Sequence, residues 1–142
     1  MTGTIEPWKP APTDVVLQVP AVAASLRVVR MVAATVAADD GFDVDEVDDV
    51  RMAVDELCAA MIESRPTSPL QIHFRLDRHR LEVRVEAEQP DPGALVPVDE
   101  LRAAVLGATA GEHRFSLADG RAVAWLMKQS EVAAAGHGHA GA

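Results

Sequence analysis

Residues 43–66 read DVDEVDDVRMAVDELCAAMIESRP, and this stretch carries the clearest helix signal in the chain. Asp43 followed three residues later by Glu46 matches a capping box, and the acids beside them favour the positive end of a helix dipole. Apolar side chains then recur on one face for about four turns, and Pro66 ends the pattern. The stripe consists of Val47, Val50, Val54, Leu57 and Met61. We expect a long amphipathic helix packed on a core.

The segments around this helix alternate in ways typical of strands and shorter helices. Asp119-Gly120 is a favoured dipeptide for a tight hairpin turn because glycine accepts a positive φ. Strands are predicted at 15–19, 70–76, 81–87, 113–117 and 121–128, and helices at 21–38 (stopped by Gly41) and at 97–106 (followed by Gly107). The order β-α-α-β-β-α-β-β predicts an α/β fold: a two-layer sandwich whose mixed, mainly antiparallel sheet is covered on one face by helices.

The two ends of the chain differ in composition from the middle. Residues 1–13 are rich in proline and predict an extended N-terminal arm. Residues 130–142 are rich in alanine, glycine and histidine and predict a disordered tail. We therefore expect one domain, at residues 14–129.

Composition narrows the function classes. The chain has 142 residues with 22 acidic and 13 basic side chains, a formal charge of −9, which disfavours direct binding to nucleic acid and suits a basic protein partner. Cys58 is the only cysteine, so an internal disulfide is excluded and a reducing compartment fits best. No signal peptide or membrane-spanning run is visible, and we expect a cytoplasmic protein with no membrane contact.

Simple catalytic and metal motifs are missing from the sequence. His137 and His139 have no acidic or cysteine ligand beside them, so a metal site is not expected there. His73, His79 and His113 have no serine or cysteine nucleophile at a recognisable spacing. The two commonest phosphate-binding loops, G-x-x-x-x-G-K-S/T and G-x-G-x-x-G, are also absent. Hydrolase and P-loop chemistry are therefore unsupported.

Residues 14–128 resemble the bacterial anti-sigma factor/serine-protein kinase family of stress and sporulation partner switches, which has a histidine-kinase-like ATPase fold. The resemblance rests on DEVDDVRMAVDELCAAMI (45–62), on DGRAVAWLMK (119–128), and on the strand, arginine-bearing helix and hairpin around them. The family's second helix typically reads AVSEACTNA, which residues 53–60 match in spacing.

The resemblance assigns Glu56 to the family's general base, which acts on a serine of an anti-anti-sigma protein. Ala60 stands where the family has an asparagine that binds magnesium, and a methyl group offers no lone pair to a metal. Without the resemblance, Glu56 is an ordinary acid on a packed helix. Both interpretations are open from the sequence, and a general base has no task unless a phosphoryl donor is positioned beside it.

Other nucleotide-binding positions of the family are also altered. Its D-x-G-x-G motif aligns with Ala87 at the aspartate and Gln89 at the first glycine, so only a displaced Asp91-Pro92-Gly93 remains as a weak cofactor-binding candidate. The glycine-rich ATP lid is shortened to LGATAGEH, residues 106–113. We therefore expect a degenerate ATP site with no cofactor, or Mg-ATP if the site works.

Partner binding does not need nucleotide. Arg30 aligns with a first-helix arginine through which a member of the family contacts its sigma factor and antagonist, and Arg27 lies beside it. The alternative is that both arginines only solvate an apolar helix.

The resemblance implies an anti-sigma regulator that sequesters a sigma factor, is released by an anti-anti-sigma protein, and forms a homodimer. The alternatives are an active ATP-dependent serine kinase that phosphorylates the anti-anti-sigma protein, or a scaffold for another regulator.

Overall fold

The computed structural model describes residue 5 and residues 8–131. Its elements follow the order that the sequence predicts. They are β1 (Val15–Val19), the short 3-10 turn η1 (Ala23–Ser25), α1 (Leu26–Asp39), α2 (Val44–Glu63), β2 (Leu70–Asp77), β3 (Arg80–Glu88), α3 (Glu100–Thr109), β4 (Glu112–Ala118) and β5 (Arg121–Gln129).

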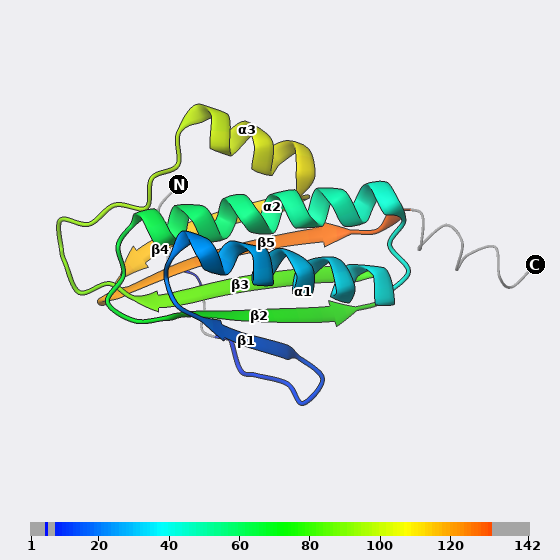
Figure 1. Cartoon of the computed structure of the whole chain (residues 1–142), viewed down its shortest axis with the longest axis horizontal. Coiled ribbons are helices and arrows are strands. Elements are labelled where there is room, and N and C mark those ends of the chain that lie inside the picture. Colours follow the sequence, from blue (N-terminus) through cyan, green and yellow to red (C-terminus); the bar gives the residue numbers. More distant parts are fainter. Residues whose placement is uncertain (1–4, 6–7, 132–142) are drawn as a thin grey trace, which may run out of the picture.

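The five strands form one sheet in the order β1-β2-β3-β5-β4. All four pairings are antiparallel, so the described sheet lacks the parallel pair that a mixed sheet would contain. Figure 1 shows α1 and α2 side by side over one face of the sheet, with α3 beside α2. The predicted two-layer α/β sandwich is confirmed.

Helix α2 begins and ends as its sequence predicts. The Asp43 side chain accepts a hydrogen bond from the Glu46 backbone N–H at 2.7 Å, and Glu46 accepts one from the Asp43 N–H at 3.1 Å. This completes the predicted capping box. Val50, Val54, Leu57 and Met61 are fully buried in the core.

The starts of the other two helices were predicted too early. Regular α1 begins at Leu26 after the turn η1, five residues past the predicted start. Helix α3 begins at Glu100, because the Asp99 side chain accepts from the Arg102 N–H at 2.8 Å and caps it there. Gly107 therefore lies inside the last turn of α3 rather than after it.

The sheet face opposite the helices is partly covered by the predicted N-terminal arm. The Arg75 guanidinium lies 4.0 Å from the ring centroid of Trp8, and His73 meets the same ring edge-on. Arg75 also donates to the carboxylate of Asp14 at 2.7 and 2.9 Å and to the Lys9 carbonyl. These contacts fasten residues 8–14 to β2. On the same face, the Arg114 guanidinium lies 5.1 Å from the ring centroid of Trp125.

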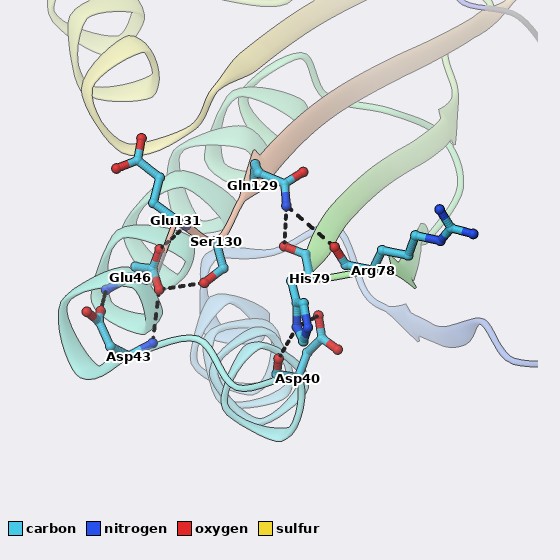
Figure 2. Close-up of polar contacts among 8 residues, drawn as sticks. All are labelled: Asp40, Asp43, Glu46, Arg78, His79, Gln129, Ser130 and Glu131. Atoms are coloured by element: carbon cyan, nitrogen blue, oxygen red, sulfur yellow. Dashed lines mark hydrogen bonds and ion pairs between the residues drawn. The ribbon is translucent and has the colours of Figure 1, made fainter. Parts of the chain in front are cut away.

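The start of α2 is tied to the end of β5 (Figure 2). Besides closing the capping box, the Glu46 carboxylate accepts from the Ser130 hydroxyl at 2.8 Å and from the Glu131 N–H at 3.0 Å. Ser130 is fully buried. Packing thus continues two residues into the predicted tail, whose remainder, 132–142, lies outside the described residues.

Among the described residues, no helix combines the length and apolar character needed to cross a bilayer. In that part of the chain no three His, Cys, Asp or Glu side chains are grouped as metal ligands. His137 and His139 lie outside it.

Candidate functional site

Glu56 lies on α2 facing α3, and its carboxylate is held by an arginine. Arg102 donates from Nε to Glu56 at 2.9 Å and from a terminal nitrogen to Glu63 at 2.6 Å. Its other terminal nitrogen donates to the Pro97 carbonyl at 2.6 Å. One guanidinium therefore joins α3 and the loop before it to two acids of α2, a contact we call the Arg102 latch.

The electrostatics of the latch favour the charged form of arginine. The Arg102 side chain is only 16% exposed, whereas the Glu56 side chain is 30% exposed. Partial burial opposes the charge, but hydrogen bonds from Arg102 to Glu56 and Glu63 outweigh it and raise the pKa of Arg102.

The positions that the sequence resemblance aligns with nucleotide contacts are buried in this structure. Ala60 is fully buried, and Ala87 is 2% exposed. Gln89 is also buried, and its side-chain nitrogen donates to the carbonyls of Ser64 and Arg65 at 2.6 and 3.0 Å. Gln89 therefore braces the end of β3 against the C-terminal end of α2.

The displaced Asp91-Pro92-Gly93 segment forms a turn on its own. The Asp91 carboxylate accepts from the Gly93 N–H at 2.8 Å, and both residues are exposed. One Asp91 oxygen is thus used inside the loop. The assignment of Asp91 and Gly93 to a cofactor stays a prediction.

The arginines of α1 lie on the outer side of the helix layer. Arg30 donates to Asp55 of α2 at 2.8 Å, and its side chain remains 42% exposed. Arg27 is exposed and has no hydrogen bond or ion pair within the described part of the chain. Val28 and Met31 beside them are 44% and 66% exposed. The structure gathers cationic and apolar side chains here, on a surface we call the α1 face.

A family model for the histidine kinase-like ATPase domain matches residues 19–117. The chain belongs to this family. The match spans most of the described chain, from the last residue of β1 through most of β4, and includes α2 and the Arg102 latch. It confirms the ATPase-like fold that the sequence resemblance implied.

A solved structure supports the same fold. The RsbU and RsbW domains of Rv1364c from Mycobacterium tuberculosis match at a TM-score of 0.66 and 19% identity, over 84% of this chain. The aligned part is 32% of that protein's chain, so this chain corresponds to a minor portion of it. No curated protein gives a significant match.

Sequence reasoning missed Arg102 and the role of Gln89. Arg102 lies 46 residues from Glu56, so no local spacing reveals the latch. The one available signal was Asp99, a good helix cap, which places Arg102 in the first turn of α3 with Glu100. Gln89 was noted only as a lost glycine, although a polar residue at a buried strand end needs partners.

Proposed function

We propose that this chain is an anti-sigma-type regulator that sequesters a sigma factor, is released by an anti-anti-sigma protein, and has lost ATP binding and kinase activity or keeps them weakly. The observation that carries the proposal is the Arg102 latch on Glu56, beside the packed positions Ala60, Ala87 and Gln89. A magnesium nucleotide needs lone pairs and open space where this chain has methyl groups and a buried amide. The fold of an RsbW-containing relative is consistent with the partner-switch role.

The loss of nucleotide chemistry is tested by calorimetric titration with Mg-ATP, followed by labelled ATP and a candidate anti-anti-sigma protein. We expect no saturable binding and no phosphoserine. Micromolar binding together with serine phosphorylation would instead establish the alternative function, an active ATP-dependent serine kinase that uses Glu56 as its base.

We place sigma-factor binding on the α1 face. An arginine fork pairs well with carboxylates at interfaces, and exposed Val28 and Met31 add apolar surface around it. The ion pair with Asp55 leaves Arg30 partly exposed, so a partner can compete for it. Homodimerisation, action in the cytoplasm and the domain boundaries 14–129 belong to the same proposal.

Two variants separate a binding role for Arg30 from a structural one. Arg30→Ala removes the guanidinium, whereas Asp55→Ala removes only its intramolecular partner. We expect Arg30→Ala to weaken capture of the sigma factor at least tenfold and Asp55→Ala to retain it. Equal loss in both variants would show that the ion pair only holds α1 against α2. Capture unchanged by Arg30→Ala would move the interface elsewhere and favour the scaffold alternative.

A further inference from the structure

A cavity of about 660 Å³ lies between the loop before α3, α3 itself and β4. The loop supplies Leu95 and Val96, α3 supplies Ala103, and β4 supplies Phe115 and Leu117. Apolar side chains dominate the lining. Both the volume and this lining are typical of sites for small ligands.

The cavity borders the positions that the resemblance assigns to nucleotide, because Pro92 of the displaced motif and His113 at the end of the shortened lid line it, but it does not reach α2. No residue of α2 lines it, and neither Ala87 nor Gln89 does. The Arg102 latch holds the loop that lines the cavity at Val96 and Val98. Arg102 does so because it binds the Pro97 carbonyl and the carboxylates of α2 at once. Because this loop is already held in place, less conformational entropy is lost when a ligand binds.

The charges around the cavity disfavour an anion. Arg102 is already bound to Glu56 and Glu63. Arg114 belongs to the lining, but its guanidinium lies over the Trp125 ring on the other face of the sheet. Burial lowers the pKa of His113, which lines the cavity, so its ring is neutral near pH 7. Exposed acids, Asp91 and Asp99, adjoin the lining residues Pro92 and Val98 in sequence.

The β4 side of the cavity offers neutral hydrogen-bonding groups. Five consecutive residues, 113–117, line it, and β5 is the only strand paired with β4 among the described residues. Alternate backbone N–H and C=O groups of an edge strand point away from its neighbour. An amide or a heteroaromatic edge can pair with such groups.

We propose that this cavity binds an uncharged small molecule with an apolar body and an amide-like hydrogen-bonding edge. The apolar body packs between Val96, Ala103 and Leu117, and the polar edge meets the backbone of β4. The site is independent of the proposed sigma-factor binding on the α1 face, so either assignment can fail without the other.

The test uses acetanilide as the probe, with the full chain and ligand-observed saturation-transfer NMR. Ala103→Trp puts an indole into the cavity, whereas Ala104→Trp places the same side chain at the adjacent, exposed position of α3, which does not line it. We expect saturable wild-type binding, an at least tenfold weaker Kd in Ala103→Trp, and wild-type binding in Ala104→Trp. Excess Mg-ATP should not displace the probe.

A second filling variant protects the test against misfolding. Val98→Trp fills the cavity from the loop wall, and it decides the outcome if Ala103→Trp lacks a wild-type circular dichroism spectrum. Equal binding in the filled and control variants, absence of saturable binding, or competition by Mg-ATP would each overturn the proposal.

Discussion

The two ends of α2 use acidic residues in opposite ways. At the N-terminal end, Glu46 closes a capping box with a neighbour three residues away and then binds the chain at Ser130 and Glu131. At the C-terminal half, Glu56 is held by Arg102, which is 46 residues away. The first arrangement begins with a contact between residues close in sequence and adds a contact to the end of the chain's last strand. The second depends entirely on segments that are distant in sequence.

This difference shows which half of α2 is free to change function. The capping box and the buried stripe keep the helix in place without help from Glu56 or Ala60. In the proposed function, the C-terminal half of α2 loses its nucleotide ligands while the fold persists. Hydrogen bonds from Gln89 and Arg102 hold this half of the helix instead.

The largest effect is expected from breaking the N-terminal end with Glu46→Ala. The variant loses the reciprocal cap and both contacts to the end of β5, and we expect a loss of about 2–3 kcal/mol of unfolding free energy. Urea denaturation measures it. Glu46→Gln keeps an acceptor oxygen and should lose about half as much unfolding free energy. A loss below about 0.5 kcal/mol for Glu46→Ala would show that the Glu46 contacts drawn in Figure 2 contribute little.

Gln89→Ala tests the brace at the other end. It removes three hydrogen bonds, two to the carbonyls of Ser64 and Arg65 and a longer one from the Asp91 N–H. The two carbonyls are left short of a partner, so we expect about 2 kcal/mol of destabilisation. Gln71→Ala, at an exposed position of β2, is the matched control and should stay within about 0.5 kcal/mol of wild type. Equal effects of the two changes would remove the structural role assigned to Gln89.

Arg102→Ala opens the latch. We expect a smaller loss, about 1 kcal/mol, because both carboxylates of the latch can be solvated once the arginine is gone. Mg-ATP should still fail to bind by calorimetry, since Ala60 and Gln89 remain. Nucleotide binding gained by this single change would mean that the latch alone blocks the site.

Arg51→Ala measures how much an exposed ion pair on the solvent side of α2 contributes to stability. Its ion pair with Asp48 is about half exposed on both sides, and such pairs contribute about 0.5 kcal/mol or less. Thermal unfolding should therefore be nearly unchanged. A larger shift would indicate that charge on α2 as a whole, rather than the contacts at its two ends, governs stability.

The same distinction explains how much the sequence could predict. The capping box of Asp43, the alternating strands and the Asp119-Gly120 turn are local patterns, and all are present as expected; Asp119 and Gly120 both have positive φ. The start of α3 was misplaced because Pro97 was a weaker start signal than Asp99. The Arg102 latch and the Gln89 brace could not be predicted, since each depends on segments brought together only by the folded chain.

The outer face of the sheet has a spectroscopic consequence. The chain has two tryptophans and no tyrosine, and Trp8 and Trp125 both lie on this face, each beside an arginine. Intrinsic fluorescence therefore reports the N-terminal segment and β5, on the side of the sheet away from α2. Release of residues 8–14 from Arg75 should alter the emission of Trp8, whereas a ligand beside Glu56 should leave the tryptophan emission nearly unchanged.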